Sequence, residues 1–187
     1  MAASYFPSTE FLRICTINSE MNPGPQRFAV FPKTISAGTD DPQQQYRRLD
    51  THFAVHGHEA KPGVEPTAEF GPERIAVYPI DHLRDLERSG SETTPVYSLT
   101  KSGALAVPTG KVFVRLAPKL KFEDSAESFR RAGYEIDQSL SYAPNAGWLR
   151  PTSTSIESSL SNLSKLSTIP DVENVQPQML SKRASKI

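Results

Sequence analysis

The chain has 187 residues, with 21 Lys and Arg balanced by 21 Asp and Glu, one cysteine and sixteen prolines. A net charge of zero argues against a protein that binds nucleic acid through bulk electrostatics. The single Cys15 excludes an intramolecular disulfide framework and any cysteine-based zinc cluster. No apolar run approaches the ~18 residues of a membrane span. Because Glu10 and Arg13 interrupt the first apolar stretch, we expect no signal peptide and a cytoplasmic location.

The zero net charge hides an asymmetry along the chain. Residues 1–110 carry 10 basic and 13 acidic side chains and eleven of the prolines, whereas residues 111–187 carry 11 basic and 8 acidic side chains. Proline and glycine punctuate residues 18–73, where no helical period persists and only Arg27–Phe31 is typical of a strand. We therefore expect residues 1–73 to form a largely irregular N-terminal extension.

Residues 74–107 have the pattern of a short β-rich lead-in. Alternation of apolar residues predicts a strand at Arg74–Tyr78, and one or two helical turns are expected over Asp81–Arg88. A second strand is expected at Thr94–Leu99, where the proline favours a strand start or an edge. Ala104–Val107 predicts a third, short strand.

Residues 108–180 have the clearest pattern. Lys111–Leu116 is β-branched and alternating, which predicts a strand. Asp124–Glu127 has the sequence of a capping box, which would begin a helix that ends at Gly133. Tyr134–Tyr142 alternates weakly and predicts the next strand.

The rest of this segment predicts a turn, a strand, a helix and a last strand. Turn residues at Pro144–Gly147 precede a strand that resumes at Trp148–Arg150. A second capping box, Thr154–Glu157, opens a helix whose apolar residues recur at helical spacing, namely Ile156, Leu160, Leu163 and Leu166. Val172–Met179 predicts the final strand, and residues 181–187 are expected to form a C-terminal tail.

This element order, β-α-β-β-α-β in about 70 residues, is that of the ferredoxin-like, split βαβ plan. We therefore expect an α+β fold in which a four-stranded antiparallel sheet carries two helices on one face, after an irregular, partly β N-terminal extension. The other face of the sheet would be left open, and such a face commonly binds a partner. Because many functions use this plan, the fold alone does not decide the function.

The strand at Val112–Leu116 and the helix after it resemble the opening of an RNA-recognition motif. The third strand of that family carries two exposed aromatic residues on which bases stack. Here the third strand offers only Trp148–Arg150. An RNA- or peptide-binding adaptor that uses the open sheet face is therefore the alternative function, beside a module that only mediates dimerisation.

Four short motifs follow one another between residues 94 and 177: Thr94–Tyr97 (TPVY), Pro108–Arg115 (PTGKVFVR), Tyr142–Ala146 (YAPNA) and Ile169–Pro177 (IPDVENVQP). In order, the motifs are similar to four elements of one known type of domain: the strand that precedes the domain, its opening strand, its hairpin and its closing segment. Together with their spacing, they make residues 94–180 resemble the prodomain of subtilisin-like serine proteases.

The resemblance implies an intramolecular chaperone and a product-like inhibitor, either as the N-terminal part of a precursor or as a separate partner. The open sheet face would pack on the protease, and residues after the last strand would lie extended in its active-site cleft. The expected partner-binding residues are Tyr142, Trp148, Gln178, Met179, Leu180, Ser181, Lys182 and Arg183. We expect no cofactor, no metal, no membrane and no nucleic-acid partner.

The chain does not carry the catalytic motifs of the protease itself. Asp50–His52 and His56–His58 match only fragments of a histidine motif, and no Gly-Thr-Ser-Met-Ala-like nucleophile segment occurs. The spacing of the three histidines in these segments fits no single helix face, so we interpret them as solvated loop residues. Cys15 is interpreted as a structural thiol in a short apolar patch. We therefore expect no enzymatic activity from this chain.

Overall fold

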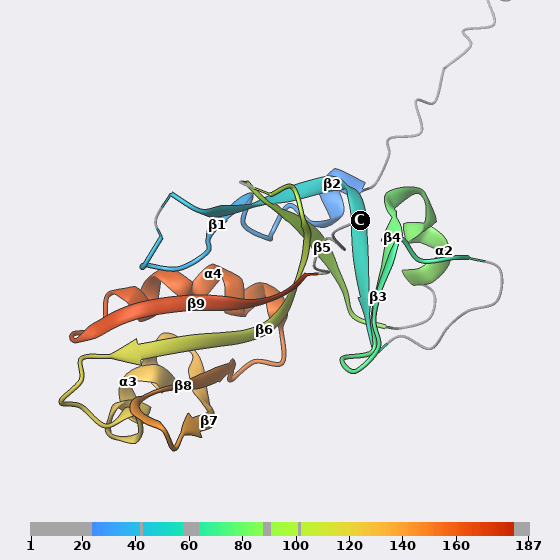
Figure 1. Ribbon diagram of the computed structural model, residues 1–187. Coiled ribbons are helices and arrows are strands. Elements are labelled where there is room, and N and C mark those ends of the chain that lie inside the picture. The colour runs from blue at the N-terminus through green and yellow to red at the C-terminus, as the bar shows by residue number, and fades with distance from the viewer. Residues whose placement is uncertain (1–23, 42, 58–63, 88–90, 101, 182–187) are drawn as a thin grey trace, which may run out of the picture.

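The computed structural model describes residues 24–41, 43–57, 64–87, 91–100 and 102–181, which form an α+β fold around a nine-stranded sheet (Figure 1). Every strand pairing in these ranges is antiparallel. The strands are β1 (Thr34–Ser36), β2 (Gln45–His56), β3 (Ala68–Phe70), β4 (Ile75–Pro79), β5 (Thr93–Leu99), β6 (Leu105–Leu116), β7 (Tyr134–Leu140), β8 (Ala143–Pro151) and β9 (Val172–Ser181). The helices are α1 (Gly24–Arg27), α2 (Leu83–Glu87), α3 (Ala126–Ala132) and α4 (Ile156–Ser167), with 3-10 turns η1 (Ile80–His82) and η2 (Phe122–Ser125).

Strand β6 joins the two parts of the sheet. The strand order is β3-β4-β2-β5-β6-β8-β7, with β1 added to β2 and β9 added to β6. Ala106 pairs with both β5 and β9, and the stretch from Val112 to Arg115 pairs with both β8 and β9. One edge of β6 therefore holds β9 along most of its length, while its other edge is divided between β5 and β8. We call β1–β5 with α1 and α2 the N-terminal part, and β6–β9 with α3 and α4 the C-terminal part.

A bulge lies where β6 passes from one part to the other. The β6–β9 register shifts between Pro108 and Val112, and Gly110 between them has a φ of 84°. This left-handed conformation favours glycine because a side chain would be strained there. The buried Ser159 hydroxyl of α4 donates a hydrogen bond of 2.6 Å to the Gly110 carbonyl oxygen. Helix α4 is thereby attached to the sheet at its bend.

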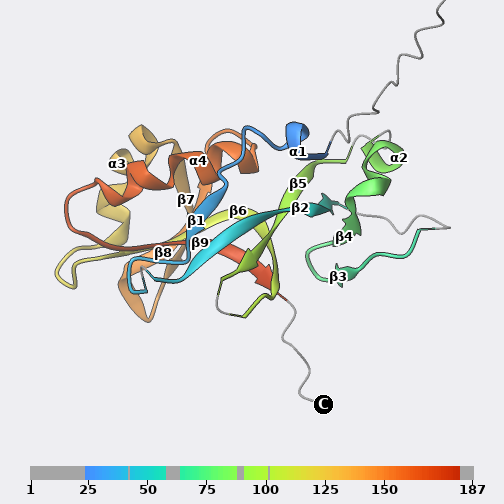
Figure 2. The same ribbon diagram turned by 90° about the horizontal axis from the view of Figure 1, so that it is seen from above.

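Helix α4 also supplies apolar side chains to both parts. Ile156 and Leu160 belong to a core that includes Phe28 and Phe31 of the N-terminal part. Leu166, two turns further on, belongs to the core of the C-terminal part with β6, β7, β8 and α3. Figure 2 shows the segment that leads to β1 running beside α4. The two parts thus share one helix. Among the described residues, no helix is long and apolar enough to cross a membrane.

The elements expected from residue 74 onward are largely present. Strands β4, β5 and β6 overlap the predicted strands almost completely, η1 and α2 occupy the predicted helical turns, and the later elements follow in the expected order. The α+β class is therefore confirmed, whereas the expected four-stranded sheet is wrong for the sheet as a whole, which has nine strands because β1–β5 extend it. The predicted short strand at Ala104–Val107 and the predicted strand at Lys111–Leu116 form a single strand, because the Gly110 bulge bends the chain without ending its pairing.

The expectation of an irregular segment before residue 74 is wrong for the described residues. Strand β2 is twelve residues long and lies between β4 and β5, while β1 pairs with its first residues. Its first half is mostly polar and only partly buried, so the strand has little apolar alternation to reveal it. Arg27–Phe31 is not a strand: α1 and a turn place Phe28 and Phe31 in the core.

Three local predictions in the C-terminal part differ from the structure. Pro144–Gly147 lies inside β8, because the β7–β8 turn occurs at residues 141–142. Asp124 lies within η2 and does not cap α3, whose N-cap is Ser125 without a side-chain bond. The second capping site is Ser155, whose side chain accepts from the backbone amide of Ser158, one residue later than the predicted box.

Gly147→Ala should destabilise the fold because Gly147 fills a close packing position. A Cβ there would lie 2.6 Å from the backbone oxygen of Gln138 and closer still to the buried ring of Phe122. We expect the free energy of unfolding to fall by about 2 kcal/mol. Urea unfolding followed by the fluorescence of Trp148 measures this change.

Gly71→Ala is the matched control, since a Cβ at Gly71 meets nothing within 4 Å. Its free energy of unfolding should stay within about 0.5 kcal/mol of the unaltered chain. An equal effect of both substitutions would contradict the packing argument.

Candidate functional site

The face of the C-terminal sheet that α3 and α4 leave uncovered carries the candidate site. Val112, Val114 and Leu116 of β6 point into the core with both helices. Strand alternation places Phe113 and Arg115 on the opposite face. There Phe113 lies opposite Trp148 of β8 on one side and Gln176 of β9 on the other.

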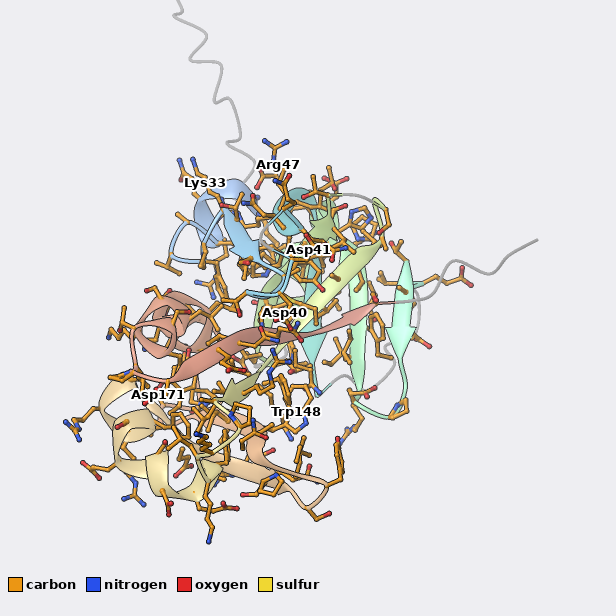
Figure 3. All side chains as sticks on the ribbon, turned by 60° about the vertical axis from the view of Figure 1, so that its left-hand side comes forward. Lys33, Asp40, Asp41, Arg47, Trp148 and Asp171 are labelled. Atoms are coloured by element: carbon orange, nitrogen blue, oxygen red, sulfur yellow. The ribbon has the colours of Figure 1, made fainter. Side chains whose placement is uncertain are left out.

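Phe113 and Trp148 form an aromatic pair near the middle of this face. Their ring centroids are 5.4 Å apart with an interplanar angle of 62°, an edge-to-face arrangement that aromatic pairs favour. Both side chains are only half-buried. Figure 3 shows Trp148 on the side of the sheet away from the helices. We call Phe113 and Trp148, with the ion pairs around them, the aromatic face.

Three cations surround the aromatic pair, and each has a carboxylate partner. Lys111 Nζ lies 2.8 Å from Asp137 Oδ2, and Arg150 Nε lies 2.8 Å from Glu135 Oε1. Arg115 lies 3.1 Å from an oxygen of Asp40 and 3.5 Å from one of Glu173, namely Asp40 Oδ1 and Glu173 Oε2. These pairs are exposed, so they add little stability, but they leave the rim of the face close to neutral.

A loop of the N-terminal part contacts the beginning of β9 beside this face. The Thr39 amide and hydroxyl donate to Asn174 Oδ1 at 3.2 and 2.8 Å, and the same hydroxyl lies 2.8 Å from the Glu173 carbonyl oxygen. Asn174, which is only 2% exposed, in turn donates to Asp40 Oδ2 at 2.7 Å. The contact with Glu173 occupies one backbone carbonyl that the edge strand would otherwise offer to another chain. The partners lie about 135 residues apart, so no sequence pattern links them.

The residues expected to bind a partner fall in three places. Trp148 lies on the aromatic face, whereas Tyr142 is 83% exposed at the tip of the β7–β8 hairpin. Gln178–Ser181 belong to β9, which ends at Ser181 and not at Met179. Lys182 and Arg183 lie outside the described residues. Sequence reasoning missed Phe113, although alternation along β6 gives it the same face as Lys111 and Arg115.

A cleft of about 350 Å³ lies between β1 and α4. Its walls are apolar and hydroxyl side chains, without a titratable group: Pro32, Thr34, Ile35, Ser36, Thr39, Leu160, Ser161, Leu163, Ser164, Ser167, Val175 and Pro177. It therefore holds no general acid or base.

The histidines of the N-terminal part are not loop residues where the structure describes them. His52 and His56 both belong to β2, while His58 and Cys15 lie outside the described residues. His56 Nε2 lies 2.9 Å from the hydroxyl of the fully buried Thr94, and burial lowers the pKa of the imidazole to about 4. Within the described ranges, no three His, Cys, Asp or Glu side chains are grouped to hold a metal ion.

Comparison with known protein families, with curated proteins and with solved structures finds no match to this chain. The site therefore has to be interpreted from its own geometry.

His56 should make the stability of the fold depend on pH. Its folded pKa of about 4 lies below the ordinary 6.5, so the unfolded chain binds the proton more readily. The contribution is complete above pH 6.5 and is lost as pH falls toward 4, by about 2–3 kcal/mol. Urea unfolding of His56→Gln and the unaltered chain across this range measures the difference.

His52→Gln changes the other histidine of β2 and is the control. It should keep the pH dependence of the unaltered chain. If His56→Gln also keeps the pH dependence of the unaltered chain, the His56 imidazole is not the source of that pH dependence.

Proposed function

We propose that this protein is a prodomain-like chaperone and inhibitor of a subtilisin-like serine protease. The proposal starts from the four motifs between Thr94 and Pro177 that are similar in order and spacing to those prodomains. The first two motifs lie in β5 and β6, the third begins in the β7–β8 turn and continues into β8, and the last leads into β9. Their segments are thus elements of one continuous sheet, as a shared module would require.

The C-terminal part is, in this proposal, a ferredoxin-like unit. Its elements follow the order β6-α3-β7-β8-α4-β9. Its strands pair in the antiparallel order β9-β6-β8-β7, which is the order of the split βαβ plan with the first and third strands in the centre. Helices α3 and α4 share one core on one side of these strands. The N-terminal part extends this sheet through β5 instead of forming an irregular leader.

The observation that carries the proposal is the aromatic face. It presents a half-buried Phe113–Trp148 pair on a sheet surface that neither helix of the C-terminal part covers. Aromatic side chains surrounded by polar groups are typical of the centres of protein–protein interfaces. A protease that folds against this face would gain apolar contact area before its own core is complete. The chain then acts by binding alone, as the N-terminal part of a precursor or as a separate partner in the cytoplasm.

The rim of the aromatic face favours a protein partner over nucleic acid. Lys111, Arg115 and Arg150 each already have a carboxylate within 3.5 Å. Phosphate binding would have to displace these carboxylates, whereas nucleic-acid sites depend on unneutralised cations. The edge-to-face contact also makes Phe113 and Trp148 a poor platform for stacked bases. An RNA-binding adaptor is therefore the alternative outcome of the test below.

Trp148→Ala should weaken inhibition of the cognate protease about 30-fold, because hot-spot aromatic residues contribute on this scale. The measurement is the inhibition constant of the full chain against a panel of purified subtilisin-like serine proteases. Circular dichroism checks that the variant is folded, as expected for a half-exposed side chain.

Val30→Ala is the matched control, since Val30 is 67% exposed and lies in the N-terminal part, away from the aromatic face. It should inhibit like the unaltered chain. Inhibition of no protease in the panel, together with salt-sensitive binding of RNA oligomers that Trp148→Ala abolishes, would replace the proposal by the adaptor function.

A chain that ends after Ser181 should keep the fold but inhibit at least about tenfold more weakly. Every described strand is complete at Ser181, so its stability should be unchanged. The residues removed are those that follow β9 and are proposed to enter the cleft of the protease. Thermal unfolding and the inhibition constant are measured on the same sample. Equal potency of the two chains would rule out a cleft-occupying tail.

A further inference from the structure

The last residues of β9 are held in the sheet by their own ladder. Beyond the bulge at Gly110, β9 pairs again with the beginning of β6, with Met179 opposite Pro108, Leu180 opposite Val107 and Ser181 opposite Ala106. Ala106 is at the same time paired with Tyr97 of β5. The end of β9 therefore lies against a strand that the N-terminal part fixes from its other edge.

Side chains hold this stretch from both faces of the sheet. Met179 packs against the core that contains Phe53 and Ile156, and Leu180 packs against the core on the opposite face. Gln178 accepts a hydrogen bond of 2.7 Å from the Thr109 hydroxyl at its Oε1 atom. Detaching these residues would break the ladder and expose two apolar side chains to water.

We infer that Gln178–Ser181 form the fixed root of the inhibitory tail and stay paired with β6 when the protease is bound. This inference rests on the proposed function and makes Met179 and Leu180 positioning residues that touch no substrate. A fixed root sets the place and direction in which the chain leaves the sheet. It also raises the effective concentration of the residues after Ser181 at the active-site cleft of a protease bound to the aromatic face.

A reversible disulfide between the two cysteines of an Ala106→Cys, Ser181→Cys double variant tests this inference. The two positions are directly paired in an antiparallel ladder, where Cα atoms lie about 4.5–5.5 Å apart, within the range that a disulfide spans. Cys15→Ser is included so that these are the only two thiols. Mass spectrometry measures the extent of the cross-link, and inhibition of the protease is compared before and after reduction.

The inference predicts that the oxidised, cross-linked chain inhibits as strongly as the reduced chain. If β9 has to detach for its residues to enter the cleft, oxidation abolishes inhibition and reduction restores it, which would overturn the inference. Ala106→Cys alone, treated with the same oxidant, shows whether oxidant without a cross-link has an effect. A reduced chain that inhibits no protease of the panel would contradict the proposed function itself, so the two failures are distinguishable.

Met179→Ala provides a second, independent readout. Loosening the root should weaken inhibition about tenfold. Oxidation of the double-cysteine variant that also carries Met179→Ala should restore inhibition, because the cross-link replaces the lost packing. A side chain that contacts the protease directly would not be rescued by a cross-link in the sheet. Absence of rescue would therefore show that Met179 does not act by positioning.

Discussion

The fold depends on the double pairing of β6. One edge of this strand pairs with β9, and the other is divided between β5 and β8. A single twelve-residue strand is therefore hydrogen-bonded to strands of both parts. The bulge at Gly110 lets the strand bend without losing either partner, and the Ser159 hydroxyl satisfies its carbonyl. Because buried backbone groups have to be paired, the two parts cannot be separated at β6 without leaving an unsatisfied strand edge in each.

The uncovered face of the C-terminal sheet follows from this arrangement. Both helices of the C-terminal part are used on one face, where α4 also closes the N-terminal core, so the aromatic face has no helix left to cover it. The N-terminal loop with Thr39 contacts Glu173 and Asn174 of β9 but leaves Trp148 half-exposed. In the proposed function, the partner would bind this uncovered face. The ion pairs around Phe113 hold the rim neutral, which favours a partner recognised by shape and apolar contact.

The C-terminal part was predictable because its signals are local. The alternation in β6 and the helical spacing from Ile156 to Leu166 each lie within a dozen residues, and both elements occur where expected. Strand β2 could not be recognised in this way, since its polar first half is extended only because β1 and β5 pair with it. Trp148 was a predicted contact residue. The role of Phe113 depends on the β6–β8 register, which places it opposite Trp148. The Thr39–Asn174 contact depends entirely on tertiary structure.

The sharing of α4 also has a consequence for synthesis. A ribosome produces Phe28 and Phe31 long before Ile156 and Leu160, which complete the same core. Chains generally fold as segments emerge, but this core has to wait for a helix more than a hundred residues later. During that interval the core of the N-terminal part has Leu83 and Leu86 of α2 but lacks the side chains that α4 contributes. The first half of this protein therefore keeps apolar surface exposed until α4 has been made, and such exposure makes a partly folded chain prone to aggregation.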